Sequence, residues 1–238
     1  MKIPFIIPNY NQLTFLKNLI NWIRWYYPNP VEYPIFIVDN NSNYPPLLEY
    51  YNLATTPTVI RNSENTFIPN LRKFIDEQIK GKYEYYVISD PDIMPHPATP
   101  KNFIEAFISV MNEHKLHRIG FGLITNDLPD YLHEKAMIVG NEQELKSTPV
   151  STSFGIGYKA PIDTTFCLYS TKNRGWEAPM DGKDWGNCMR LFEAFHLGWY
   201  IDGNNLNEEQ KHYFSTSKYR VPGEPSAGCN NNRPKEYQ

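Results

Sequence analysis

Two carboxylates stand one residue apart in Asp90-Pro91-Asp92, directly after an aromatic and β-branched run. In extended backbone, residues two apart share a face, so both carboxylates can reach one hard divalent cation. A cation held in this way keeps open positions for phosphate oxygens. Asp and Pro are also ordinary turn residues, so the structural alternative is a strand that ends in a simple Asp-Pro turn.

The run Tyr83–Ile88 predicts a buried strand that delivers these two acids to the edge of a sheet. Two earlier apolar runs, Phe5–Ile7 and Tyr33–Val38, are separated by residues 13–27, where apolar side chains recur at helical spacing. Apolar strands joined through a helix predict parallel strands covered on both faces. Ligands bind such sheets at the carboxyl ends of the strands, so Asp90 and Asp92 should face a crevice.

Polar residues also end the other strands predicted in the first half: Pro8–Asn11, Asp39–Ser42, and Arg61–Asn65 after a short strand at Thr58–Ile60. A helix should begin at Pro69 and carry Arg72 and Lys73 in its first turn, where basic side chains oppose the helix dipole. An anionic ligand near the helix start would compensate these two charges. A solvated helix face is the plain alternative.

The second half of the chain gives weaker signals. It predicts helices over Pro100–Met111 and Glu208–Phe214, and strands over His117–Ile124 and Ile162–Tyr169. Between residues 126 and 161 the pattern indicates only a short helix near residues 141–145 and a flexible loop through residues 147–158, and such long loops often act as lids. No repeat or linker divides the chain. We therefore expect one α/β domain over residues 1–229, with a mixed, mostly parallel sheet flanked by helices, and a flexible tail over residues 230–238.

Composition excludes several classes of protein. With 23 basic and 26 acidic residues the net charge is −3, which argues against a nucleic acid partner. Cys167, Cys188 and Cys229 are widely spaced and signal neither a disulfide framework nor a zinc site. No segment approaches the roughly 18 apolar residues of a membrane span, and the first residues do not form a signal peptide. We expect a soluble, cytoplasmic protein that can still meet a membrane-bound acceptor at the periphery.

Taken together, these motifs resemble the glycosyltransferases of the A-type (GT-A) fold, particularly small family-2-like members that act on nucleotide sugars. The resemblance is carried by residues 8–11, 38–42, 61–62 and 70–73 and by Asp90-Pro91-Asp92 as a DXD motif. It resumes at residues 163–166 and 196–200, which look like the Asp-Thr-Thr-Phe and His-Leu-Pro-Trp-Tyr signatures of a bacterial and viral subgroup. Gly198 stands where that subgroup has Pro, a change that affects loop stiffness but keeps the histidine.

The resemblance implies a Rossmann-like GT-A domain with a nucleotide site and a metal site. The implied nucleotide contacts are Pro8, Asn9 and Tyr10 as the wall around the base, Asp39 as the partner of the base or ribose, and Arg72 or Lys73 as residues that orient the nucleotide. Asp92 would ligate Mn²⁺ or Mg²⁺ on the diphosphate, and Asp90 would contact ribose or metal. His196 would be a further metal or diphosphate ligand, and histidine suits Mn²⁺ better than Mg²⁺.

The expected chemistry is a metal-dependent, inverting sugar transfer. The metal neutralises the departing diphosphate as a Lewis acid, and one carboxylate takes the proton of the attacking hydroxyl. The candidates for this base are Asp163, Glu177, Asp181 and Asp184. We favour Asp163, because a strand entrance fixes a side chain more rigidly than a loop does. A strand-initiating Asp that caps backbone amides is the alternative for Asp163.

The sequence does not specify the nucleotide base, the donor sugar or the acceptor. A UDP-sugar donor and a glycan or other hydroxyl acceptor are the first expectations. One rival is a phosphohydrolase of the haloacid dehalogenase type, whose Asp-x-Asp also follows a hydrophobic strand, although Met94 stands where that family has Thr or Val. A second rival is a non-catalytic nucleotide-sugar or carbohydrate-binding module. A nucleotidyltransferase fits worse, because no glycine-rich phosphate loop follows the first strand.

Overall fold

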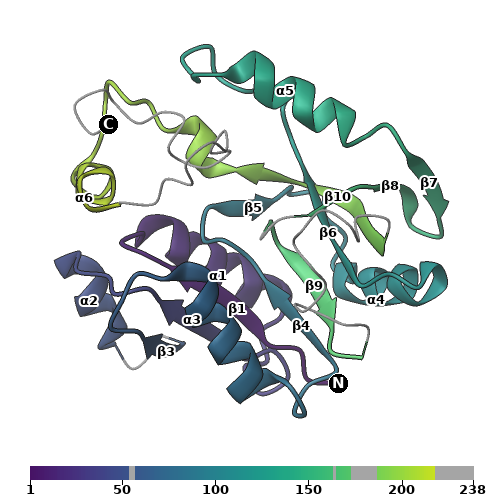
Figure 1. The fold of residues 1–238 in the computed structure, drawn as a ribbon, viewed down its shortest axis with the longest axis horizontal. Coiled ribbons are helices and arrows are strands. Elements are labelled where there is room, and N and C mark those ends of the chain that lie inside the picture. The colour runs from purple at the N-terminus through teal and green to yellow at the C-terminus, as the bar shows by residue number, and fades with distance from the viewer. Residues whose placement is uncertain (54–56, 163–164, 173–186, 218–238) are drawn as a thin grey trace.

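The computed structural model describes residues 1–53, 57–162, 165–172 and 187–217. In these ranges ten strands form one sheet in the order β3-β2-β1-β4-β9-β6-β10-β8-β7, and β5 pairs with β10 outside that path (Figure 1). The strands are β1 (Phe5–Asn9), β2 (Ile35–Asp39), β3 (Thr58–Arg61), β4 (Tyr85–Ile88), β5 (Ile93–Pro95), β6 (Arg118–Leu123), β7 (Pro149–Thr152), β8 (Gly155–Lys159), β9 (Cys167–Ser170) and β10 (Cys188–His196). The helices are α1 (Thr14–Tyr26), α2 (Pro45–Tyr51), α3 (Phe67–Phe74), α4 (Phe103–His114), α5 (Lys135–Glu144) and α6 (Glu208–Thr216), with a π-helical turn η1 (Ile75–Ile79) and a 3₁₀ turn η4 (Leu197–Tyr200).

The directions of the strands confirm a mixed and mostly parallel α/β sheet. Strands β3, β2, β1 and β4 are all parallel, and so are β6 and β10. Strand β9 runs antiparallel between β4 and β6, while β8 and β5 run antiparallel to β10. The carboxyl ends of β1, β2 and β4 therefore meet at one edge of the sheet, as the sequence predicts.

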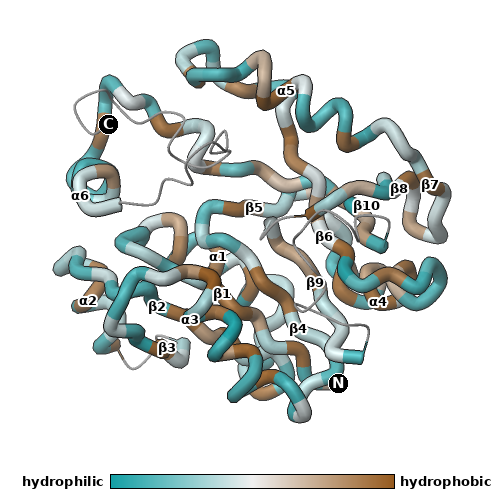
Figure 2. The backbone as a smooth tube through the Cα atoms, in the orientation of Figure 1, coloured by the Kyte–Doolittle hydropathy of each residue, from teal (hydrophilic) through white to brown (hydrophobic). Residues whose placement is uncertain are grey.

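Helices cover both faces of the parallel half, which explains its apolar strands. In β1, Phe5 and Ile7 join a core cluster with residues of α1 and α4, whereas Ile6 joins a second cluster with residues of α3 and η1. Side chains alternate along a strand, so a strand buried on both faces must be apolar throughout. Figure 2 shows hydrophobic residues following β1 and β4 through the middle of the molecule.

The segment between β6 and β9 differs from the flexible loop expected there. Residues 149–159 form the β7–β8 hairpin, in which Gly155, at a positive φ of 115°, begins β8 directly after the turn. Strand β8 then packs against β10 so closely that a Cβ on Gly157 would lie 2.7 Å from Met189 Sδ. Tertiary contact with β10 thus makes a strand from a Ser-, Thr- and Gly-rich sequence that signals a loop on its own. Helix α5 also begins earlier than expected, at Lys135.

Two further boundaries are corrected. Strand β9 begins at Cys167 rather than Ile162, because Phe166 adopts a left-handed φ of 53° that interrupts extended backbone. Strand β5, which the sequence did not signal, is a three-residue strand that ends in Pro95 and lies along β10.

The remaining expectations concern membranes and cysteines. Within the described ranges, no helix combines the length and apolar character needed to cross a membrane. Cys167 and Cys188 are buried free thiols. Cys229 and the expected tail over residues 230–238 lie outside the described residues, so the domain boundary at residue 229 stays a prediction.

Candidate active site

Three parallel strands bring their polar ends together at the edge of the sheet. The register pairs Asn9 of β1 with Asp39 of β2, and the Asn40 N–H donates to the Asn9 carbonyl at 2.8 Å. On the other side of β1, the Ser89 N–H donates to the Ile6 carbonyl at 3.1 Å, which leads β4 into the Asp90-Pro91-Asp92 turn. Backbone pairing alone therefore places the ends of β2, β1 and β4 next to one another.

Asp39 is fully buried and its carboxylate is held by its own surroundings. Oδ1 accepts the Ser42 N–H at 3.0 Å and lies 3.6 Å from Arg61 Nε, while Oδ2 accepts the Tyr51 hydroxyl at 3.0 Å. Burial and the neighbouring Asp39 raise the pKa of Tyr51 well above its usual range, so the phenol keeps its proton and donates it. The Tyr51 oxygen in turn accepts Asn9 Nδ2 at 2.9 Å. Sequence reasoning found Asp39 and Asn9 but missed Tyr51, which comes from α2.

Asn11 ties this edge of the sheet to the C-terminal helix α6. Its backbone has a left-handed φ of 53°, its N–H donates to Ser42 Oγ at 2.9 Å, and its Oδ1 accepts the Asn43 N–H at 2.8 Å. Asn11 Nδ2 donates to Thr216 Oγ1 at 2.9 Å, and the Tyr10 hydroxyl donates to the Thr216 carbonyl at 3.0 Å. Helix α6 thereby fixes the loop after β1, a contact that the sequence did not signal because its partners lie at opposite ends of the chain.

Asp92 and His196 form a buried pair at the end of β4. They are 3% and 7% exposed, and His196 Nδ1 lies 3.6 Å from Asp92 Oδ2. The antiparallel pairing of β5 with β10 sets His196 opposite Ile93, and the Leu197 N–H donates to the Asp92 carbonyl at 2.7 Å. The imidazole also stacks on Trp199 at 4.8 Å between ring centroids. The structure thus brings Asp92 and His196 together, and their role as metal ligands stays a prediction.

The backbone at Asp90 differs from the extended one expected. Asp90-Pro91-Asp92-Ile93 forms a turn in which the Ile93 N–H donates to the Asp90 carbonyl at 3.3 Å. Proline favours such a turn, so the argument that two residues apart share a strand face does not apply here. Asp90 is half-buried while Asp92 is buried, and the two acids therefore have different surroundings.

The buried pair fits a divalent ion that is completed by a substrate. Among the residues described, no group of three or more His, Cys, Asp or Glu side chains converges as a metal site. Buried His196 Nδ1 finds no hydrogen-bond partner among the residues that the structure describes, and the Asp92 carboxylate lies beside it. Mg²⁺ and similar ions are often held by one or two protein groups together with substrate phosphates. Two facing donors, one carboxylate oxygen and one imidazole nitrogen, meet that requirement.

Arg72 and Lys73 do not lie where the sequence placed them. Helix α3 begins at Phe67, so both residues fall in its last turn, where basic side chains agree with the helix dipole. Both are exposed. The residue of α3 that reaches the strand ends is Asn70, whose Nδ2 donates to Asn40 Oδ1 at 2.9 Å.

The sequence predicts four carboxylates as candidates for the catalytic base. Asp163, Glu177, Asp181 and Asp184 all lie outside the described residues. The expectation that Asp163 enters a strand loses its support, because β9 begins only at Cys167. The choice among these carboxylates stays a prediction.

Comparisons with known proteins identify the fold. No protein-family model matches the chain, and no curated protein sequence matches it significantly. Among solved structures, the mannosyltransferase PcManGT from Pyrobaculum calidifontis, in complex with GDP-Man and Mn²⁺, aligns with a TM-score of 0.52 at 13% identity, over 82% of this chain and 56% of that one. TarS 1-349 from S. aureus in complex with UDP-GlcNAc aligns with a TM-score of 0.46 at 14% identity, over 83% of this chain and 60% of that one.

The chain has the GT-A fold. It spans less than two thirds of the length of the structures to which it was compared.

Proposed function

We propose that the chain is a glycosyltransferase that moves a sugar from a nucleoside-diphosphate sugar to a hydroxyl acceptor. The observation that carries this proposal is one edge of a GT-A sheet with a preorganised carboxylate, Asp39, and a buried Asp92–His196 pair. The two features follow strands that flank β1. The surroundings of Asp39 suit a nucleoside, and the Asp92–His196 pair suits a metal-bound diphosphate.

The nucleoside would bind beside Asp39. The bonds from Ser42 and Tyr51 fix the carboxylate before a ligand arrives. Asp39 is fully buried, so a ribose hydroxyl or a base N–H would bond to it only after a neighbouring side chain, such as exposed Arg61, moves aside. Asn9 Oδ1 is buried and has no hydrogen-bond partner in the described part of the chain. Pro8, Asn9 and Tyr10 would form the wall around the base, and Arg72 or Lys73 would contribute only a long-range positive potential. A UDP-sugar stays the first donor to test, with a GDP-sugar next to it.

The diphosphate would bind at the Asp92–His196 pair with Mn²⁺ or Mg²⁺. Asp92 and His196 would hold the ion, and Asp90 would contact the ion or the ribose. When bound, the ion supplies Lewis-acid stabilisation of the leaving diphosphate. The structure of PcManGT was obtained with GDP-Man and Mn²⁺, which supports the choice of Mn²⁺ as the first ion to test.

The transfer is a single displacement. The acceptor oxygen forms a bond to the anomeric carbon while the bond from that carbon to the diphosphate oxygen breaks, and the electron pair leaves with the diphosphate. The acceptor proton passes to a carboxylate, for which Asp163 and then Asp181 are the candidates. One displacement inverts the configuration at the anomeric carbon.

The proposal is tested by nucleoside diphosphate release from UDP-glucose, UDP-GlcNAc and GDP-mannose, with Mn²⁺, with Mg²⁺ and with EDTA. We expect one donor to be consumed only when a divalent ion is present, and Asp39→Asn to weaken its use. Asp130→Asn removes an exposed surface carboxylate and serves as the matched control. If no donor is consumed with either ion, the proposed activity is wrong. Donor binding without any consumption would support the non-catalytic module instead.

A further inference from the structure

We propose that the cavity beside the middle of β10 is a saccharide site that receives the acceptor as a neutral, roughly disaccharide-sized chain. This inference rests on the proposed transferase function. The cavity lies beside β10, whose residues 190–193 line it together with residues of β6, β8 and α5, Lys146 just after α5, and the connection from β5 to α4. Asp39 and Asp92 are not among the residues that line it.

A gap in strand pairing creates the cavity. Strand β8 pairs with β10 at Met189 and Arg190, whereas β5 pairs with it from Ala194 onward. Between these pairings, β10 changes register with β6 around Leu191, and the residues from Arg190 to Glu193 line the cavity. Its volume is about 370 Å³, which falls within the usual range of ligand sites.

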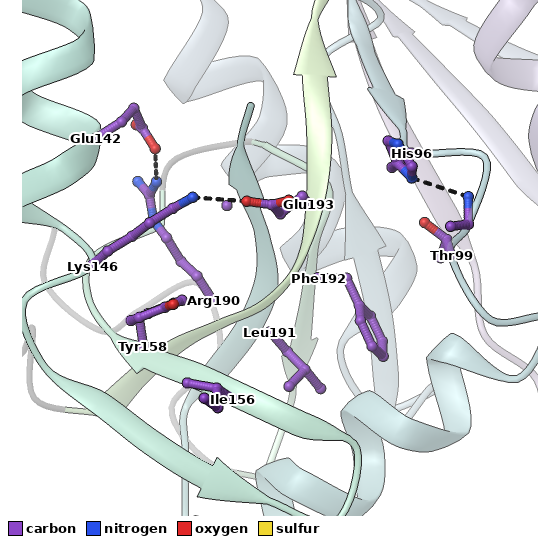
Figure 3. Close-up of a pocket in the computed structure, with 12 residues that line it drawn as sticks. His96, Thr99, Glu142, Lys146, Ile156, Tyr158, Arg190, Leu191, Phe192 and Glu193 are labelled. Carbon is purple, nitrogen blue, oxygen red and sulfur yellow. Dashed lines mark hydrogen bonds and ion pairs between the residues drawn. The ribbon is translucent and has the colours of Figure 1, made fainter. Parts of the chain in front are cut away.

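The charged groups of the cavity are paired and balanced. Arg190 Nη1 donates to Glu142 Oε2 at 2.7 Å, and both residues are 7% exposed. Lys146 Nζ lies 2.7 Å from Glu193 Oε1 (Figure 3). Two cations and two carboxylates leave no net charge for an ionised ligand to neutralise. Carboxylate oxygens and the Lys146 ammonium still have unused acceptor and donor positions, which suit the hydroxyl groups of a neutral sugar.

Apolar and aromatic side chains complete the lining. Tyr158 lies beside Lys146 and Arg190, and Phe192 and Ile156 lie along the lower part of the cavity (Figure 3). Ile156 is 60% exposed, so a ligand that covers it removes apolar surface from water. A pyranose ring offers an apolar C–H face and a polar hydroxyl rim, and an aromatic side chain with a polar handle matches both.

The β5–β10 ladder connects this cavity to the candidate active site. Asp92 and His196 meet at one end of the ladder, and at the other end the His96 N–H donates to the Glu193 carbonyl at 3.0 Å. His96 and Glu193 both line the cavity. Glu193 and His196 are three residue steps apart on β10, about 10 Å along the strand, and their side chains lie on opposite faces of the sheet, whereas Phe192 of the lining shares the face of His196. The volume of the cavity, about 370 Å³, suits a ligand of roughly two sugar rings.

The experiment uses lactose, maltose, N,N′-diacetylchitobiose and anionic lactobionate as probes in saturation-transfer NMR. Ile156→Trp fills the cavity, and Phe154→Trp is its control on the same hairpin, outside the lining. Lys146→Gln removes a lining cation, and Lys135→Gln is its control, because Lys135 also pairs with a carboxylate but does not line the cavity. All four positions are partly or largely exposed, so each variant should fold.

We expect at least one neutral disaccharide to bind the wild-type chain, and Ile156→Trp and Lys146→Gln to weaken it roughly tenfold. The two controls should match the wild type, and lactobionate should bind more weakly than lactose. The inference is overturned if no disaccharide binds, if Ile156→Trp leaves binding unchanged, or if lactobionate binds best. UDP and GDP binding with Mn²⁺ is measured on the same samples. Disaccharide binding without nucleotide binding would leave the saccharide site standing and refute the transferase, whereas the reverse result would refute the saccharide site alone.

Discussion

The two halves of the sheet offer different kinds of binding groups to a ligand. In the parallel half, β2, β1 and β4 deliver polar residues to one edge, where hydrogen bonds from Ser42 and Tyr51 hold Asp39 and Arg61 lies 3.6 Å away. In the other half, β10 pairs in parallel with β6 and antiparallel with β8 and β5, and ion pairs line a cavity between the pairings with β8 and β5. A carboxylate poised at strand ends suits one defined group, such as a nucleotide. A balanced cavity suits a ligand of many hydroxyls.

The largest effect on activity is expected where the two halves of the sheet meet, at Asp92. Asp92→Asn removes the carboxylate beside His196, and we expect turnover to fall by about 10³-fold, because charge stabilisation of a leaving group is usually the largest single contribution to catalysis. Circular dichroism should show an unchanged fold. Wild-type turnover by this variant would remove the Asp92–His196 pair from the mechanism.

The largest loss of stability is expected from Arg190→Met, in the half of the sheet that contains the cavity. Arg190→Met leaves Glu142 buried without its cation, and removal of one partner of a buried pair costs about 3–5 kcal/mol. Lys135→Met breaks the exposed pair with Asp130 and should cost much less stability, because exposed ion pairs contribute little. Urea unfolding of both variants measures the difference. Equal costs would show that the Arg190–Glu142 pair does not stabilise this half.

Tyr51→Phe tests how the parallel half holds Asp39 in place. The variant removes the hydroxyl that links Asp39 to Asn9 and leaves two buried polar groups with one fewer partner each. We expect a loss of about 1–3 kcal/mol in the free energy of unfolding and weaker nucleotide binding. Tyr50→Phe, on the same helix, is the control. Nucleotide affinity equal to that of the wild type would show that Tyr51 does not orient Asp39 for the ligand.

The smallest effects should come from the exposed cations of α3. Arg72→Gln and Lys73→Gln should each weaken nucleotide binding by about twofold or less, because exposed charges contribute little and salt screens them. The measurement is nucleotide affinity at low and high salt. A tenfold loss that persists at high salt would show direct contact with the ligand and would restore the role first expected for these residues.

The parallel half of the sheet could be predicted from the sequence better than the half around β10. The parallel half follows from local signals, since each apolar run that ends in polar residues became a strand, and Asp39 and Asp92 lie at its edge. The turn at Pro91 and the start of α3 at Phe67 depend on local details that periodicity does not resolve. The hairpin, β5 and the cavity depend on contacts between distant segments, such as Gly157 against Met189. Tyr51 and α6 were missed for the same reason.

The central claim is that a metal-bound nucleoside diphosphate occupies the edge between Asp39 and Asp92. Isothermal titration calorimetry of UDP and GDP into the chain, with Mn²⁺ and then with EDTA, tests it most directly. We predict that one of the two nucleotides binds in the presence of Mn²⁺, that EDTA weakens the binding, and that Asp39→Asn and Asp92→Asn each reduce it. The claim is contradicted if neither nucleotide binds with Mn²⁺, or if both variants bind as well as the wild type.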